Sequence, residues 1–280
     1  MLSVVGLGTG ASKIVEKFQG KPEYDVYQMN ADIKRTSKRK FRLKTHIDPE
    51  AYEENVPDVR GFFKDLKKRV QFYIVGASYS SNYTLGILEQ IKNTQIELFY
   101  IRPDIELLSG IPKLIERTTF GVLQEYARCG LLENITFLSN LKIEAAIQDI
   151  PVKTYYDTLN NTVQSVVHYV NYFEHNEPEI GVVAKPSLIS RIRTFGMLNM
   201  ENLEEKWLFD LDIDREVCYY LCINKETLKT DGSLHRRYVE MLKQKPRNAF
   251  RNISYAIYET DSERDFGFCV ARTNVIQQNA

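Results

Sequence analysis

The first eighteen residues constrain the fold more than any other part of the chain. A short apolar run with Val4 and Val5 needs burial, and apolar residues at helical spacing extend from Ala11 to Phe18. Between the two patterns stand three glycines at alternating positions, Gly6, Gly8 and Gly10. The segment therefore predicts a buried strand that turns through glycines into a helix.

A helix that begins directly after such a turn carries unpaired backbone N–H groups at its first residues. The helix dipole is positive at the same end, so a phosphate group binds there readily. Glycine lacks the Cβ that would block the turn or the approach of a ligand. The segment thus predicts a phosphate site at Gly8, Thr9, Gly10 and Ser12, although a tight turn without any ligand would need the same glycines.

Strand and helix patterns alternate over the first two-thirds of the chain. Strands are expected at residues 2–5, 24–29, 70–75, 96–101, 135–138 and 180–184, and helices at 12–18, 83–92, 111–127 and 153–173. Such alternation predicts an α/β fold, in which a mostly parallel sheet is covered by helices on both faces. The last helix carries a long apolar stripe, which suits a central helix between two domains or a plain core helix.

The pattern changes after Trp207. Residues 217–223 favour a strand, a helix is expected from Asp231 to before Pro246, and residues 253–258 and 266–271 are expected to form a hairpin. A chain of 280 residues, 43% hydrophobic, can bury one large core or two modest ones. We therefore expect an α/β domain at 1–175, a connecting loop and helix at 176–214, and a small α+β domain at 215–280.

Charge and hydropathy argue against two classes of partner. The 37 basic and 37 acidic residues balance, so no net field attracts nucleic acid or an anionic membrane. No apolar run approaches the roughly 20 residues of a membrane helix. A basic run at residues 34–44 precedes an acidic stretch at 48–58, which favours a solvated surface loop over a phosphate-binding one.

The four cysteines indicate the compartment. They lie in apolar stretches without metal-type spacing, which predicts buried free thiols. Free thiols fit a reducing, cytoplasmic compartment. The four histidines have no metal-type arrangement either, so no metal ligand is expected.

Taken together, the motifs resemble those of the tubulin/FtsZ superfamily of nucleotide-dependent filament proteins. The opening segment is similar to the family's strand, glycine loop and helix, and residues 27–32 are similar to its Asn-Thr-Asp stretch. Residues 72–84 occupy the place of the glycine-rich signature loop. The resemblance covers nearly the whole chain and rests on the order and spacing of motifs, as in a divergent phage- or plasmid-type relative.

The resemblance implies a site for GTP or GDP, with magnesium, between subunits that assemble head to tail. The implied nucleotide contacts are Gly6, Gly8, Thr9, Gly10, Ser12, Asn30, Asp32, Gly76, Ser78, Ser80 and Ser81, with Asn140 and Asn160 at the ribose or base. In the signature loop, however, serines and Tyr79 stand where the family has glycines, which argues against an equally close wrapping of the phosphates.

A second departure concerns hydrolysis. In the family, a loop after the long helix carries an Asn and two acidic residues to the nucleotide of the next subunit. The corresponding places here hold Val182, Ala184 and Ser187. Because water activation needs a base or an orienting carboxylate, we expect no catalytic residue, and impaired turnover if the chain is a GTPase at all.

Three functions remain open at this point. The first is a tubulin-like assembly protein that binds GTP or GDP, and the second is a structural or adaptor protein that has lost the nucleotide. The third is an NAD(P)-binding enzyme, because residues 6–11 satisfy G-x-G-x-x-A and Asp25 or Asp32 lies near the ribose-binding position. The missing catalytic residues rank the enzyme last.

Overall fold

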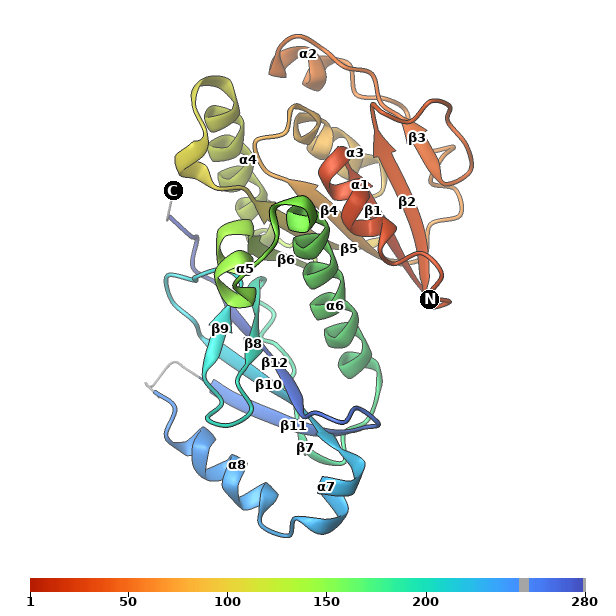
Figure 1. Cartoon of the computed structure of the whole chain (residues 1–280). Helices are drawn as coiled ribbons and strands as arrows, with labels where there is room; N and C mark the ends of the chain where they lie inside the picture. The colour runs from red at the N-terminus through yellow and green to blue at the C-terminus, as the bar shows by residue number, and fades with distance from the viewer. Residues whose placement is uncertain (247–251, 279–280) are drawn as a thin grey trace.

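One twelve-stranded sheet runs through the whole molecule (Figure 1). The structure is a computed structural model, and it describes residues 1–246 and 252–278. The strand order is β3-β2-β1-β4-β5-β6-β8-β12-β10-β11-β7, and β9 pairs with β8 beside this path. The sheet therefore continues from the N-terminal half of the molecule into the C-terminal half.

The N-terminal half of the sheet is parallel. Its strands are β1 (Leu2–Leu7), β2 (Tyr24–Asn30), β3 (Lys40–Arg42), β4 (Arg69–Val75), β5 (Gln95–Arg102) and β6 (Asn134–Ser139), joined by β8 (Ile192–Leu198). Parallel pairing brings all their carboxyl ends to one edge of the sheet, called here the carboxyl edge. Their starting residues lie at the opposite, amino edge.

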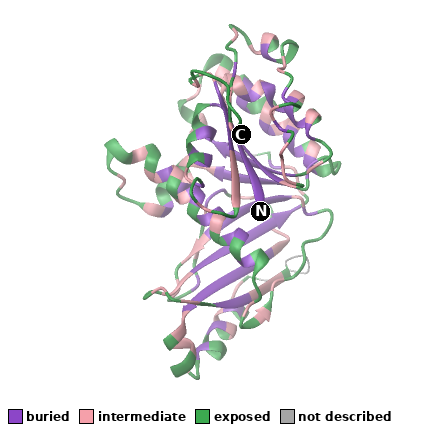
Figure 2. Ribbon diagram, turned by 90° about the vertical axis from the view of Figure 1, so that its right-hand side faces the viewer, coloured by how far each residue is buried: buried purple, intermediate pink, exposed green. Residues whose placement is uncertain are grey.

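Helices cover both faces of this half, as predicted. Helices α1 (Thr9–Glu16), α5 (Asn140–Ile147) and α6 (Tyr155–His175) contribute to one hydrophobic core, and α2 (Pro49–Glu54), α3 (Thr84–Gln90) and α4 (Gly110–Arg128) to another. The alternation of side chains explains the two cores, because Val4 faces the first and Val5 the second. Figure 2 shows the strands as a buried layer between helices with exposed outer surfaces.

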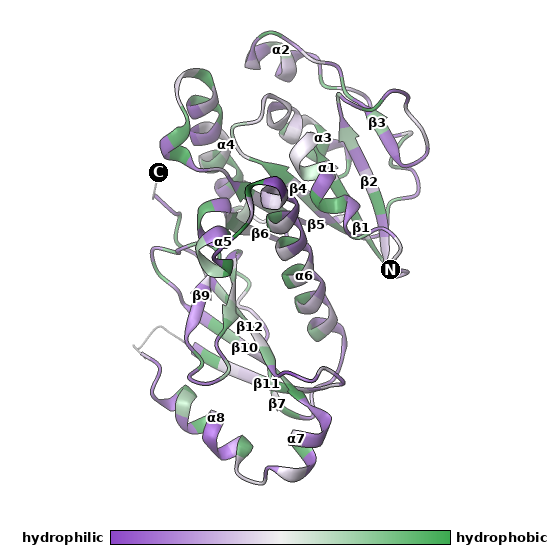
Figure 3. Cartoon of the chain, viewed as in Figure 1, coloured by the Kyte–Doolittle hydropathy of each residue, from purple (hydrophilic) through white to green (hydrophobic). Residues whose placement is uncertain are grey.

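The C-terminal half is mixed. Its strands are β7 (Ile180–Val182), β9 (Glu205–Trp207), β10 (Glu216–Asn224), β11 (Asn252–Thr260) and β12 (Phe266–Thr273). Helices α7 (Lys225–Thr230) and α8 (Leu234–Lys243) lie beside them, and α8 packs onto a third core through Leu234, Tyr238 and Leu242. The other side of α8 is hydrophilic (Figure 3), so this helix covers one face of the sheet only.

Helix α6 links the two halves. Asp157, in the first turn of α6, forms an ion pair with Lys17, the residue that caps the end of α1. Phe173, near the end of α6, stacks on Tyr220 of β10, with ring centroids 5.2 Å apart. The predicted apolar stripe begins at Tyr155, which is half-buried, and is buried from Leu159 to Phe173. The same helix thus belongs to the packing of both halves.

Three sequence-based expectations are wrong. Strands β11 and β12 do not form a hairpin, because β10 lies between them, parallel to β11 and antiparallel to β12. The segment 176–214 contains the strands β7, β8 and β9 rather than a helix. Residues 180–184 supply only a three-residue strand, which pairs antiparallel with β11 and lies outside the parallel part of the sheet.

The thiols are as expected with one exception. Cys218, Cys222 and Cys269 are buried and free, whereas Cys129 is free but exposed. Cys129 caps the end of α4, where the helix leaves the core, so its apolar neighbours do not cover it. Among the described helices, none combines the length and the apolar character needed to cross a membrane.

Candidate functional site

A cavity of about 270 Å³ lies at the carboxyl edge, where the segments after β1, β3 and β4 meet. Gly8, Thr9 and Gly10 form one side of it, and Ser78 and Ser80 form another. The structure thus brings together five of the residues that the sequence proposes for phosphate binding, although 70 positions separate the two loops.

The N-terminus of α1 opens into this cavity. The first hydrogen bond of the helix runs from Ser12 N to Gly8 O (2.9 Å), while Gly8 N is already bound to Met29 O (2.7 Å). The amides of Thr9, Gly10 and Ala11 precede that first bond, and no acidic side chain lies in the first turn. These amides are the group that an anion would meet at the positive end of the helix dipole.

The glycines of the region serve different purposes. Gly8 has a φ of 92°, and a Cβ there would stand 2.5 Å from Ser80 Oγ, so both its conformation and its close approach require glycine. Gly6 and Gly76 do not line the cavity. A Cβ on Gly6 would lie 2.6 Å from Ala11 O, and one on Gly76 would lie 2.4 Å from the Tyr100 hydroxyl, so these two positions allow close packing.

The segment after β4 is held by its own side chains. The hydroxyls of Ser78 and Ser80 are hydrogen-bonded to each other (2.7 Å), and the hydroxyl of Ser81 donates to Ser78 O (2.6 Å). It continues into the 3₁₀ helix η1 (Tyr79–Tyr83), and Ala77 has a left-handed φ of 62°. Ser78 and Ser80 therefore present hydroxyl groups over Gly8, and Ser81 is buried.

The other polar candidates near α1 bond within the protein. Asn30 Oδ1 accepts from the amides of Asp32 (3.0 Å) and Ile33 (3.1 Å), and the Thr9 hydroxyl donates to Asp32 Oδ2 (2.7 Å). Ser12 is buried, with its hydroxyl 3.4 Å from Gly6 O. Asn30 and Ser12 thus shape the β2 and α1 turns, and Asp32 fixes Thr9 at the mouth of the cavity.

Asn140 and Asn160 lie on neighbouring helices and do not line this cavity. Asn140 opens α5 directly after β6, so it stands at the carboxyl edge, and Asn160 lies one turn after Asp157 on α6. A second cavity of about 300 Å³ at the same edge includes Ser139 and Asp104. Asp104 caps the 3₁₀ helix η2 (Ile105–Leu107) by accepting from Glu106 N (3.0 Å).

Sequence reasoning missed Lys44, Thr45 and Tyr52, which also line the first cavity. Lys44 ends the basic run that the sequence assigned to a solvated loop. The run instead contains the edge strand β3, and its ion pairs join Arg39 to Asp25 (3.0 Å) and Lys38 to Asp65 (3.2 Å) rather than reaching the acidic stretch at 48–58. The available signal was the position of Lys44 directly after a strand, because strand ends meet at the carboxyl edge.

The loop that follows β7 lies at the amino edge of the sheet, opposite the cavity at the glycine loop. Val182, the last residue of β7, is 79% exposed. In the loop, Ala184 N donates to Ser254 Oγ (3.1 Å), and Ser187 N lies 3.2 Å from a carboxylate oxygen of Glu216. The chain then enters β8 at Ile192, at the amino edge. Among the described residues, no group of three His, Cys, Asp or Glu side chains is placed to hold a metal ion.

No protein-family model matches the sequence, and no curated protein matches it. Several solved structures, however, have a similar fold. A GTPγS-form protofilament of TubZ from Bacillus thuringiensis serovar israelensis superposes with a TM-score of 0.72 at 12% identity, covering 97% of this chain and 86% of that one. An empty FtsZ dimer from M. jannaschii gives 0.70 at 11% identity, covering 97% and 88%.

CetZ from Methanosaeta thermophila is similar as well, with a TM-score of 0.67 at 11% identity, covering 98% of this chain and 86% of that one. The fold of the chain is therefore the tubulin/FtsZ fold over nearly its whole length. At these identities the likeness concerns the fold, and the site has to be argued from its own residues.

Proposed function

We propose that this chain is a tubulin/FtsZ-like assembly protein that binds GTP or GDP at the carboxyl edge. The observation that carries the proposal is the cavity at the N-terminus of α1, where free amides and the glycine at position 8 face the hydroxyls of Ser78 and Ser80. Lys44 adds a positive charge to the same cavity. Backbone amides, hydroxyls and a lysine together suit phosphate oxygens.

The nucleotide would occupy the carboxyl edge as a whole. Its phosphates would bind at Gly8, Thr9 and Gly10, with magnesium held on the phosphate oxygens, and its ribose and base would extend toward Asn140 and Asn160. TubZ in a GTPγS-form protofilament has the same fold, which supports a guanine nucleotide. The buried thiols of Cys218, Cys222 and Cys269 support a cytoplasmic location.

Thermal unfolding with GTP, GDP, NAD and no ligand, each with magnesium, tests this assignment. A ligand at 100 times its dissociation constant stabilises the native state by roughly 2.7 kcal/mol, which raises the melting temperature by several degrees. We expect that shift with GTP and GDP. A shift with NAD alone would favour the dinucleotide enzyme, and no shift with any of them would favour a structural protein that has lost the nucleotide.

Exposed apolar residues at both edges support self-association. At the carboxyl edge, Ile47 and Leu107 are 94% and 82% exposed, and at the amino edge, Leu188 and Ile189 are 84% and 64% exposed. Contact between unlike surfaces at opposite ends is heterologous and propagates head to tail. Filament models of TubZ share the fold, which supports this mode.

Replacing Leu188 and Ile189 together by Asp should abolish assembly. The two carboxylates would have to lose water at a subunit contact without partners, which costs several kcal/mol. Light scattering and sedimentation measure the assembly, and the melting temperature with GTP checks that the nucleotide still binds. The conservative pair Leu188→Met and Ile189→Val should assemble normally. Filaments formed by the Asp pair would show that Leu188 and Ile189 do not lie at the subunit contact.

We expect GTP turnover close to the uncatalysed rate. The loop at the amino edge offers Val182, Ala184 and Ser187 where a water-orienting carboxylate would be needed, and the carboxylate of Glu216 is bonded to Ser187 N and to Ser190 Oγ (3.1 Å). Phosphate release from the assembled protein is the measurement. Rapid turnover would mean that another side chain, such as Glu177 or Glu179, reaches the nucleotide.

A further inference from the structure

A cavity of about 570 Å³ lies between the two halves of the sheet, away from the glycine loop. It is lined by the first residues of parallel strands, including Arg69 of β4, Asn134 of β6 and, near the start of β8, Arg193. These residues stand at the amino edge, whereas the proposed nucleotide site is at the carboxyl edge. The cavity is therefore distinct from that site.

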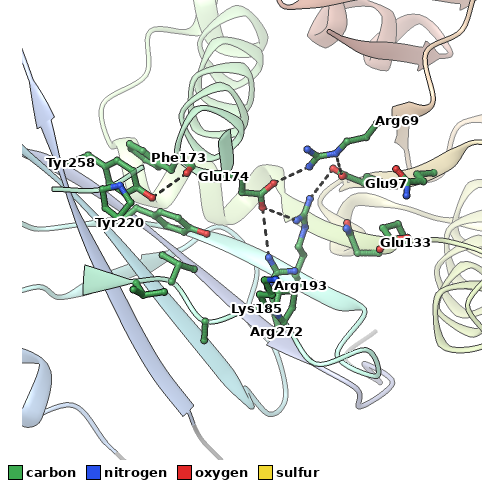
Figure 4. Close-up of a pocket in the computed structure, with 17 residues that line it drawn as sticks. Arg69, Glu97, Glu133, Phe173, Glu174, Lys185, Arg193, Tyr220, Tyr258 and Arg272 are labelled. Atoms are coloured by element: carbon green, nitrogen blue, oxygen red, sulfur yellow. Dashed lines mark hydrogen bonds and ion pairs between the residues drawn. The ribbon is translucent and has the colours of Figure 1, made fainter. Parts of the chain in front are cut away.

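Three arginines share two glutamates in this cavity (Figure 4). Glu174 accepts from Arg69 at 2.9 Å, but its other oxygen lies 3.6 Å from Arg193 and 3.8 Å from Arg272. Glu97 bonds closely to Arg69 and lies 3.4 Å from Arg193. Well-formed bonds between guanidinium and carboxylate groups are about 2.7–2.9 Å long, so Arg193 and Arg272 are only loosely paired.

Two buried polar groups of the lining have no hydrogen-bond partner among the described residues. They are Nε of Arg272, a residue that is 6% exposed, and Oδ1 of Asn134, a residue that is 7% exposed. Leaving a buried donor unpaired costs about 1–3 kcal/mol, and more when the group is charged. Both groups line the same cavity, but only the Arg272 donor can be satisfied by an anion, because Asn134 Oδ1 is itself an acceptor.

The lining has an excess of positive charge. Three arginines and Lys185 stand against Glu97, Glu133 and Glu174, which leaves one net positive charge. Lys185 is exposed at the mouth, and no ion pair is found for it among the described residues. Burial lowers the pKa of Arg193, and the nearby glutamates offset this only in part, so a further negative charge would stabilise the cation.

The opposite wall is aromatic. Phe173, Tyr220 and Tyr258 line the cavity, and the rings of Phe173 and Tyr258 have centroids 4.8 Å apart. Figure 4 shows the aromatic group on one side and the arginines with Glu174 on the other. A cavity of this size with one apolar wall and a few converging polar groups is typical of a small-molecule site.

We propose that this cavity binds a small organic anion, a phosphate ester or carboxylate with a flat apolar group, through Arg193, Arg272 and Lys185. The oxyanion would accept from Arg272 Nε and from the guanidinium of Arg193. The flat group would lie toward Phe173, Tyr220 and Tyr258. The site requires no nucleotide at the glycine loop, so this proposal can be tested independently of the proposed function.

Phenyl phosphate is the probe, and phenol and inorganic phosphate are the comparisons. The melting temperature of the full chain is measured against the concentration of each compound. We expect phenyl phosphate to raise it by several degrees at saturation, inorganic phosphate to act only at higher concentration, and phenol to have little effect. No stabilisation by phenyl phosphate would overturn the proposal.

Variants separate this site from the glycine loop. Arg272→Gln should weaken binding by about tenfold or more, and Lys185→Ala by about threefold, because Lys185 is solvated. Each shift is referred to the same variant without ligand, so a change in basal stability cancels. Lys185→Ala, on an exposed loop, keeps the test valid if Arg272→Gln does not fold.

Lys113→Ala, an exposed lysine of α4 that does not line the cavity, is the matched control and should bind normally. Gly10→Asp should leave phenyl phosphate binding intact. Binding that survives both cavity variants but is lost with the Gly10 variant would assign the probe to the glycine loop and overturn the proposal.

Discussion

Gly10→Asp should abolish the stabilisation by GTP and GDP that the proposed function predicts for the wild-type protein, roughly 2.7 kcal/mol at 100 times the dissociation constant. Gly10 is the second residue of α1, so the new carboxylate would meet the phosphates at the free amides and repel them. Its Cβ would lie 3.1 Å from Val75 Cγ2, a contact that a small side-chain movement relieves. Thermal unfolding with and without nucleotide is the measurement.

The variant itself should remain folded, because an acidic residue in the first turn of a helix is favourable by about 0.3–1 kcal/mol. Gly121→Asp is the matched control, since Gly121 lies within α4 and a Cβ there meets no atom within 4 Å. It should respond to GTP as the wild type does. If GTP and GDP stabilised Gly10→Asp as much as the wild type, the N-terminus of α1 would not be part of the nucleotide site.

Glu97→Leu should destabilise the protein by about 3–5 kcal/mol, the effect expected when one partner of a buried ion pair is removed. The side chain of Glu97 is 3% exposed and accepts hydrogen bonds from Arg69 and from Gln71 (3.0 Å). Without it, the buried guanidinium of Arg193 would keep its hydrogen bond to the Thr136 hydroxyl (2.7 Å), but its nearest carboxylate would be Glu174, at 3.6 Å. Urea denaturation measures the change in the free energy of unfolding.

The surface pair of Glu125 and Arg128 provides the control. Their side chains are 64% and 53% exposed and 3.7 Å apart, so Glu125→Leu should change the stability by less than about 0.5 kcal/mol. An equally small effect of Glu97→Leu would show that the buried network contributes little to stability.

Glu97 should also make the stability depend on pH. Burial alone would raise the pKa of its carboxyl, but Arg193 and Arg69 outweigh burial, and the net pKa is lowered from the ordinary 4.5. The contribution of Glu97 is therefore complete above pH 4.5 and is lost as the pH falls through the lowered native pKa. The stability difference between wild type and Glu97→Gln should shrink over that acidic range and stay constant near neutral pH.

The local patterns of the sequence determined the elements and the class of fold. The apolar run at Val4 and Val5, the glycine turn, the parallel sheet and the long helix α6 are confirmed, and the helix expected at 12–18 is present but spans Thr9–Glu16. Such features depend on contacts between residues close in the chain or on a periodicity that marks which face is buried. The same patterns placed the glycine loop at the end of a strand.

Only the tertiary structure decided which segments meet. Strand β10 inserts between β11 and β12, and the sequence assigned those two strands to a hairpin because they are neighbours in the chain. Glycines that look alike in sequence divide into Gly8, which faces the cavity, and Gly6, which packs on α1. The arginine cluster at the amino edge joins residues 69, 193 and 272, and no local pattern predicts contacts across such separations.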